Sequence, residues 1–211
     1  MKPIIALYVQ HPYASSQCAN GVMKALETDF SFKLFTKHEQ MSGFFDDVDM
    51  FCFPGGIGDA SNFSSIHRST ISSIKLKTKM GTPYLGICMG AYWAGSSYFD
   101  ILGRTEAVQY ITRPNTDTKR PHAKAMNVTW NGEQTKMFFY DGCALVGGEY
   151  ETVATYPNGD AMAIKKEKIG LIGCHPEAEK DWYASYSWMK KEWRGDQHQL
   201  LLDFANKLIQ K

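Results

Sequence analysis

Hydrophobic residues in the first half of the chain alternate between short continuous runs and longer amphipathic segments. Residues 4–9 form a continuous apolar run typical of a strand buried on both faces, and we predict further strands at residues 32–36, 49–53 and 83–88. Segments with mostly helical spacing, or rich in small residues, predict helices at residues 16–28, 62–80 and 90–97. This alternation predicts an α/β fold whose mostly parallel central sheet is covered by helices on both faces.

The pattern changes in the second half of the chain. Residues 104–122 are polar, contain two prolines and show no clear period, so we predict an excursion or a lid there. Five short strand-like segments follow at residues 127–130, 136–140, 152–156, 161–165 and 169–174. The Asn-Gly and Asp-Gly pairs between them predict hairpins. Residues 181–211 predict two helical stretches broken near Gly195, with side chains that could dock on the sheet: Trp182, Trp188, Leu200, Leu201, Phe204 and Leu208.

Length and charge narrow the classes of protein to consider. A chain of 211 residues with 44% hydrophobic residues can bury a full core, and we predict one domain over residues 1–211. The formal net charge is +1, so we expect no general attraction to nucleic acid or to acidic membranes. The apolar run at residues 3–9 is too short for a signal sequence or a membrane span.

The cysteines favour a reducing compartment. There are five, an odd number, widely spaced in a chain large enough not to need disulfides, so we expect a cytoplasmic protein. No Cys-x-x-Cys pair exists, and the ligand clusters of structural zinc sites are missing. We therefore expect neither a bound metal nor a cofactor.

Cys88 stands in the most informative segment, where a buried strand runs into a helix through Gly-x-Cys-x-Gly. The glycines at positions 86 and 90 leave room for a sharp, strained turn, which is the nucleophile elbow with Cys in place of Ser. A helix N-terminus at this point favours the thiolate. The alternative is a small buried hydrophobic residue at a strand end, and this is our interpretation of the other four cysteines.

Gly55 and Gly56 follow the third predicted strand and come one strand-helix unit before Cys88. In a parallel sheet the two loops emerge at the same edge, so these glycines can supply a backbone donor to an oxyanion, with the Met89 N–H as the second donor. The alternative is an ordinary tight turn.

His175 and Glu177 end the last predicted strand in the sequence Gly-Cys-His-Pro-Glu. A histidine at a strand end can present its ring to a thiolate while a carboxylate two residues on holds the other ring nitrogen. These residues predict a Cys-His-Glu triad. The other five histidines are interpreted as ordinary surface or core residues, although His11 follows the first strand and could face the same crevice.

Together, Phe53-Pro54-Gly55-Gly56, the elbow around Cys88 and His175-Pro176-Glu177 resemble class I glutamine amidotransferase domains over roughly residues 4–177. The resemblance implies a flavodoxin-like three-layer sandwich. It also implies Cys88 as nucleophile, His175 as base, Glu177 as the residue that orients it, and Gly56 with Met89 as oxyanion donors. In that family the cysteine attacks the side-chain amide of glutamine, and ammonia passes to a synthase.

One position departs from the family pattern. Tyr92 stands four residues after the nucleophile, where amidotransferases usually carry a Gln that helps to hold glutamine. The segment at 86–92, and the Ser-Ser-Gln-Cys loop at 15–18, look closer to the amidotransferase-like domain at the N-terminus of some biotin-protein ligases. Tyr92, Tyr13 and Asp59 are the predicted substrate-binding residues, with packing or helix capping as the alternative role of each.

Three hypotheses follow from these residues. The first is an amidotransferase-like cysteine hydrolase that forms a thioester with a small amide substrate, working alone or with a separate synthase or ligase subunit. The second is a non-catalytic binding or regulatory module that keeps the fold. The third is a redox protein in which Cys88 oxidises to a stable sulfinate.

Overall fold

A parallel sheet forms from the predicted apolar runs and the strand before His175. The computed structural model describes residues 1–11, 14–39 and 43–210. Five strands lie parallel in the order β2-β1-β3-β4-β11, with bounds β1 Ile4–Tyr8, β2 Ser31–Phe35, β3 Met50–Phe53, β4 Tyr84–Ile87 and β11 Ile169–Ile172. Strand order reverses beside β1, and ligands of such sheets bind at the carboxyl ends of the strands near the reversal.

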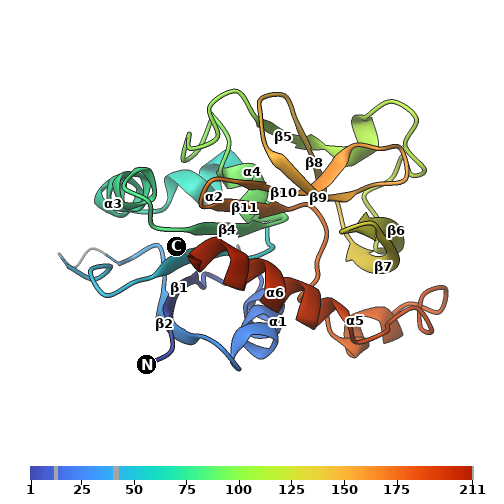
Figure 1. Cartoon of the computed structure of the whole chain (residues 1–211), viewed down its shortest axis with the longest axis horizontal. Coiled ribbons are helices and arrows are strands. Elements are labelled where there is room, and N and C mark those ends of the chain that lie inside the picture. Colours follow the sequence, from blue (N-terminus) through green and yellow to red (C-terminus); the bar gives the residue numbers. More distant parts are fainter. Residues whose placement is uncertain (12–13, 40–42, 211) are drawn as a thin grey trace.

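Helices cover both faces of this sheet (Figure 1). One face carries α1 Ser16–Leu26 and α6 Gln197–Ile209. The other carries α2 Ala60–Ser64, α3 Arg68–Lys79 and α4 Met89–Trp93. Apolar side chains from each helical layer pack on the strands in two large cores. The predicted three-layer α/β architecture is therefore confirmed.

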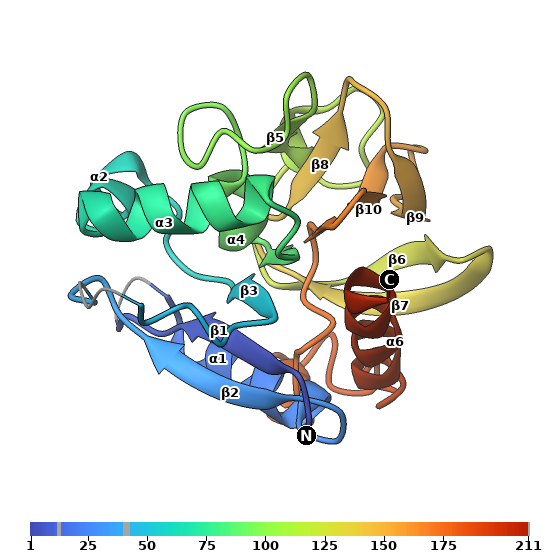
Figure 2. The ribbon, with the colours of Figure 1, turned by 60° about the vertical axis from the view of Figure 1, so that its left-hand side comes forward.

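The second half of the chain extends the sheet with antiparallel strands. After β11 the order continues through β10 Ala161–Lys166, β9 Glu151–Thr155, β6 Lys124–Trp130 and β7 Glu133–Phe139. Asn131 and Gly132 join β6 to β7 with φ of 49° and 87°, the left-handed pair that a two-residue hairpin turn requires. Figure 2 shows this hairpin beside α6. The hairpins predicted at Asn131-Gly132 and Asn158-Gly159 are confirmed, since β6 pairs with β7 and β9 with β10. The one predicted at Asp141-Gly142 is wrong, because β7 and β8 pair with other strands.

Two strands were not predicted. β5 Glu106–Gln109 pairs with β8 Cys143–Val146, and β8 also pairs with β10. The region predicted as an excursion or lid therefore begins with a strand, which the short 3-10 helix Tyr110–Thr112 follows directly. The two middle residues of β5 are only partly buried and its two end residues are exposed, so the strand carries too little apolar character for a clear signal.

Three predicted helices have different bounds. Residues 62–80 form two helices because Asp59 caps α2 through the Asn62 N–H (2.8 Å) and His67 caps α3. The helix predicted at 90–97 ends at Trp93. After α5 Lys180–Ala184, residues 185–196 lie outside the helices, so the break near Gly195 is longer than predicted. Trp188 does not dock on the sheet and is 65% exposed.

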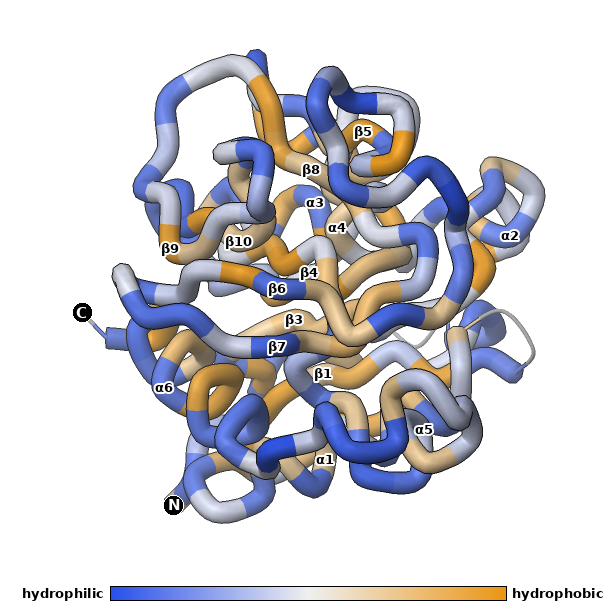
Figure 3. The backbone as a smooth tube through the Cα atoms, turned by 90° about the vertical axis from the view of Figure 1, so that its right-hand side faces the viewer, coloured by the Kyte–Doolittle hydropathy of each residue, from blue (hydrophilic) through white to orange (hydrophobic). Residues whose placement is uncertain are grey.

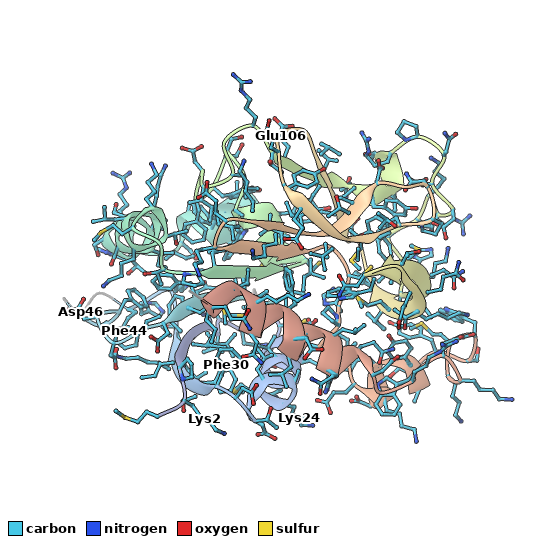
Figure 4. The ribbon with its side chains drawn as sticks, in the orientation of Figure 1. Lys2, Lys24, Phe30, Phe44, Asp46 and Glu106 are labelled. Atoms are coloured by element: carbon cyan, nitrogen blue, oxygen red, sulfur yellow. The ribbon has the colours of Figure 1, made fainter. Side chains whose placement is uncertain are left out.

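Apolar residues lie in the interior of the sheet and polar residues lie on the outside of the molecule. The backbone is mostly apolar along β1, β3 and β4 in the interior and mostly polar in the outer loops (Figure 3). Charged side chains such as Lys2, Lys24, Asp46 and Glu106 lie on the outside of the molecule (Figure 4). No helix in the described ranges is both long enough and apolar enough to cross a membrane.

Candidate active site

Cys88 sits at a strained turn between β4 and α4. Its φ of 50° and ψ of −101° lie outside the conformations that non-glycine residues ordinarily adopt. A Cβ on Gly86 would lie 2.5 Å from the carbonyl oxygen of Gly90, and a Cβ on Gly90 would lie 2.0 Å from the carbonyl oxygen of Phe53. Both flanking positions therefore need glycine, and the turn has the geometry of a nucleophile elbow.

His175 and Glu177 follow β11, the strand that pairs with β4. The His175 N–H donates to the Phe138 carbonyl at 2.8 Å, which ties the histidine to β7. The Nδ1 atom of its ring lies 2.9 Å from Oε1 of Glu177, and both side chains are buried. Because Nδ1 faces the carboxylate, Nε2 is the ring nitrogen left for another partner.

The charge on His175 depends on its two neighbours. Burial alone would lower its pKa, but the Glu177 carboxylate and the Cys88 sulfur act against burial and raise the pKa of His175 well above its usual value. Cys88 and His175 also line the same cavity. The arrangement can stabilise a thiolate beside an imidazolium.

The loop after β3 lies beside the cysteine and histidine. Gly56 lines the same cavity as Cys88, and Met89 is the first residue of α4. A Cβ on Gly55 would lie 2.5 Å from Cε1 of His175, so only glycine fits against the ring. The Gly55 carbonyl accepts from the Ser15 N–H at 3.0 Å, which fixes this loop to the start of α1.

One cavity of about 330 Å³ joins these groups. Cys88 and His175 line it, as do side chains from the loops after β1 and β3, from β7 and from α5. Such a volume suits a small molecule or the reacting end of a larger one. The four parallel strands β1, β3, β4 and β11 all deliver residues to it from their carboxyl ends.

Cys18 also belongs to this site, which the sequence reasoning missed. Its sulfur lies 4.0 Å from Nδ1 of His175 and lines the cavity, whereas the sequence had indicated a core or loop residue without chemistry. Burial raises the pKa of the Cys18 thiol, so Cys18 favours the neutral form. Cys52, Cys143 and Cys174 are core residues as expected. The Ser-Ser-Gln-Cys loop marks Cys18 only through a family resemblance, and the fold reveals its contact with His175.

The three predicted substrate-binding residues have different positions. Tyr92 does not line the cavity and donates its hydroxyl to the Asp141 carbonyl at 3.3 Å. Asp59 caps α2 and is also absent from the described cavity wall. Tyr13 lies outside the described residues. For Tyr92 and Asp59 the alternative roles of packing and capping match these contacts.

Two residues that the sequence did not single out support Glu177. The Nε2 atom of His198 in α6 lies 3.1 Å from the Glu177 carbonyl oxygen. Gly21 in α1 packs directly on Glu177, because a Cβ there would lie 2.4 Å from the same carbonyl oxygen. Helices α1 and α6 therefore fix the backbone of Glu177 from one side of the sheet. The isolated glycine inside a helical pattern was the available signal for Gly21.

One group of side chains could hold a metal ion. Ligand atoms of Cys18, His175 and Glu177 all lie within 4.8 Å of one another in the buried part of the site, although the sequence predicted no metal site. Thiolate, imidazole and carboxylate together suit zinc. A metal at these atoms would use the same Nδ1 that now contacts Glu177, so metal binding and an intact His-Glu pair exclude one another.

The chain resembles known proteins in its structure. No protein-family model matches the chain, and no curated protein matches it. A glutamine amidotransferase from Thermotoga maritima superposes with a TM-score of 0.71 at 13% identity, over 100% of both chains. The chain has the glutamine amidotransferase fold.

Two further structures with this fold agree. PurLQS from Thermotoga maritima superposes with a TM-score of 0.68 at 16% identity, over 99% of this chain and 100% of that chain. A glutamine amidotransferase from Methylobacillus flagellatus gives 0.63 at 11% identity, over 99% and 93%. At such identities the likeness to glutamine amidotransferases concerns the fold, so the activity must be argued from the site.

Proposed function

We propose that this protein is a cysteine amidohydrolase of the glutamine amidotransferase type. The observation that carries the proposal is the convergence, on one cavity, of a strained cysteine and a buried histidine-carboxylate pair. Neither feature alone would suffice, since buried cysteines and ion-paired histidines are common. Cys88 is the proposed nucleophile, His175 the base and Glu177 the residue that orients the ring.

The reaction would proceed through a thioester. The Cys88 sulfur attacks the carbonyl carbon of a primary amide, and the thiol proton passes through Nε2 of His175 to the amide nitrogen. The C–N bond then breaks and ammonia leaves. Water attacks the thioester with His175 as the base, which releases the carboxylic acid and restores the thiol. Glu177 holds Nδ1 throughout and stabilises the imidazolium.

Backbone donors would stabilise the oxyanion of each tetrahedral intermediate. Gly56 and Met89 are the proposed donors, with Gly55 giving the loop its close approach to His175. Gly56 supports this role by its position on the cavity wall, and Met89 by its place directly after the nucleophile. Loss of one such donor typically costs on the order of a hundred- to a thousand-fold in rate.

The released ammonia could pass to an acceptor held by another protein. A similar structure from Thermoplasma acidophilum, named as a putative component of GMP synthase, has a TM-score of 0.63 at 14% identity. By analogy, we propose that this chain, as a single domain, works with a separate synthase or ligase subunit when ammonia has an acceptor. We further propose a site related to that of the biotin-protein ligase branch rather than a standard glutamine pocket. The sequence lacks the usual Gln at position 92, and the Cys18 loop lines the cavity.

Mass spectrometry of the intact protein with substrate tests the proposal. We expect an acyl adduct on Cys88 and ammonia in solution, and we expect Cys88→Ala to give neither. Cys18 provides an internal control, because its raised pKa predicts slow alkylation in the same sample in which Cys88 reacts quickly. If Cys88 alkylates no faster than Cys18 and forms no adduct, the non-catalytic binding module becomes the better interpretation.

A further inference from the structure

The walls of the active-site cavity carry almost no charge. Among the described residues that line it, none is Asp, Glu, Lys or Arg. Its titratable groups are Cys18, Cys88, His175 and two tyrosines, Tyr140 and Tyr186. Residues 12 and 13, Pro and Tyr, lie outside the described residues and are uncharged in the sequence.

Three carboxylates near the wall residues in the sequence have contacts elsewhere. Asp141, which follows Tyr140, accepts both Nε2 hydrogen bonds of Gln109, at 3.0 and 3.1 Å. Asp59 caps α2. Glu179 pairs with Lys24 at 2.5 Å. None of these three side chains lines the cavity, nor does Asp181, which precedes Trp182.

Backbone groups near the nucleophile are engaged too. The Phe138 carbonyl accepts from His175, and the Gly55 carbonyl accepts from Ser15. The Tyr140 carbonyl accepts a hydrogen bond from the Cys88 thiol at 3.7 Å. Each of these carbonyls already has one donor, so an ammonium group on the substrate would have to share its acceptor. A charged group that leaves water without a partner opposes binding strongly.

The mouth of the cavity is apolar and exposed. Ile57 and Tyr140 line the cavity and are 53% and 54% exposed. Tyr186 lines it as well, and its ring lies 5.0 Å from that of Trp188, which is 65% exposed. Isolated apolar residues on a surface need no explanation, but a group that continues an active-site wall indicates a binding surface.

We propose that the substrate is an uncharged primary carboxamide with an apolar or aromatic substituent, not free glutamine. This inference rests on the proposed function, because the carboxamide is the group that Cys88 attacks. Free glutamine carries an ammonium and a carboxylate near its reacting amide. Among the described wall residues the one cationic group is His175, and its charge is already paired with Glu177. The apolar mouth instead holds the substituent, with Phe138 and Trp182 deeper in the cavity.

Kinetics with a matched pair of amides test this substrate class. Glutamine and N-acetylglutamine methylamide present the same side-chain carboxamide, with and without charges, and 3-phenylpropanamide adds an aromatic substituent. We expect kcat/KM for ammonia release from both neutral amides to exceed that for glutamine by at least about tenfold. Equal or faster turnover of glutamine would overturn the substrate class and leave the cysteine hydrolase intact.

A charge placed at the mouth gives a second measurement. Ile57→Lys should lower kcat/KM for 3-phenylpropanamide and raise it for glutaramate, an amide with one carboxylate, so that the ratio shifts at least about tenfold. Leu76→Lys is the matched control, because Leu76 is 60% exposed on α3 and does not line the cavity. An unchanged ratio in Ile57→Lys, or an equal shift in Leu76→Lys, would overturn the inference.

The two proposals fail in different ways. Two reactive probes separate them: a neutral chloroacetamide with a benzyl substituent and a diazoketone analogue of glutamine. Suppose that none of the amides is hydrolysed but the chloroacetamide labels Cys88 at least about tenfold faster than the diazoketone. Hydrolysis of these amides is then rejected, and the neutral apolar site stands. If the diazoketone labels Cys88 faster, the neutral site is rejected. If neither probe labels Cys88 faster than Cys18, both proposals fail.

Discussion

The charge on His175 is the residue-level property on which the proposed chemistry depends. Glu177→Gln keeps the shape of the side chain and removes the carboxylate that raises the pKa of His175. We expect the His175 pKa to fall and turnover to drop roughly a hundred- to ten-thousand-fold. Histidine NMR titration and the pH profile of kcat measure the two effects. Glu179→Gln, which alters an exposed ion pair with Lys24, should change turnover by less than about threefold.

The same pKa shift links His175 to stability. A histidine whose pKa is raised on folding stabilises the native state fully below its unfolded pKa of about 6.5, and this contribution is lost as the pH rises through the folded value. The stability difference between the wild type and His175→Gln should therefore shrink as the pH is raised from about 6 into the alkaline range. Chemical denaturation at several pH values tests the sign, and a growing difference would contradict the raised pKa.

Cys18 leads to a prediction about metals. Because its sulfur, the His175 ring and the Glu177 carboxylate can converge on one ion, we expect zinc to inhibit by displacing Glu177 from Nδ1. Cys18→Ala should weaken inhibition at least about tenfold, since it removes a ligand without touching the His-Glu pair. Treatment with a chelator should leave the activity of wild type unchanged. A loss of activity on chelation would mean that the metal assists the reaction.

Individual residues were predictable where a motif marked them. The glycines at 86 and 90 single out Cys88, and the spacing of His175 and Glu177 marks the pair. Cys18 has no such setting, and its role depends on α1 packing against the loop after β3. Tyr92 was marked only by comparison with a family pattern, and its hydroxyl contacts a carbonyl outside the cavity.

At the scale of elements, α1 positions Glu177 through Gly21. Alanine at this position would gain about 1 kcal/mol of helix propensity, but its Cβ would lie 2.4 Å from the Glu177 backbone oxygen. Since backbone cannot yield as a flexible side chain does, we expect the contact to dominate and turnover to fall at least about tenfold. Asn20→Ala, at an exposed neighbouring position of α1, should keep full activity and tests helix propensity alone. Full activity in Gly21→Ala would show that Glu177 tolerates displacement.

Elements with strong periodicity were predictable, and those whose bounds depend on single contacts were not. The buried runs that became β1, β3 and β4 are almost entirely apolar, so the sequence marks them clearly. The break between α2 and α3 depends on the capping side chains of Asp59 and His67, and the spacing of apolar residues carries no trace of these two contacts.

At the scale of the whole molecule, the site exists because β1, β3, β4 and β11 end at one edge of the sheet. The alternation of strands and helices in the sequence predicts that the carboxyl ends of the strands lie at one edge, because parallel strands all end on the same side of a sheet. The same reasoning does not give the order of strands, nor that β7 and α5 supply Phe138 and Trp182 to the cavity. These contacts join segments distant in sequence, and no local pattern encodes them.

Helix α6 packs on β11, one of the strands that end at this edge, which gives a last prediction. Phe204 in α6 is buried against Gly170 of β11, where a Cβ on the glycine would lie 2.7 Å from its ring, and it also meets Trp130 of β6. Phe204→Ala should cost roughly 3–5 kcal/mol of unfolding free energy through the cavity it leaves. Leu34→Ala, at a half-exposed apolar position in β2, should cost far less.

The same substitution tests whether α6 also holds the site in place. His175 lies three residues after the end of β11, and His198 of α6 contacts the Glu177 carbonyl. We therefore expect Phe204→Ala to weaken turnover at temperatures where the chain is still folded. Denaturation midpoints and turnover rates, measured on the same samples, test this link between α6 and the site. A purely global loss of stability would leave the turnover of the folded fraction unchanged.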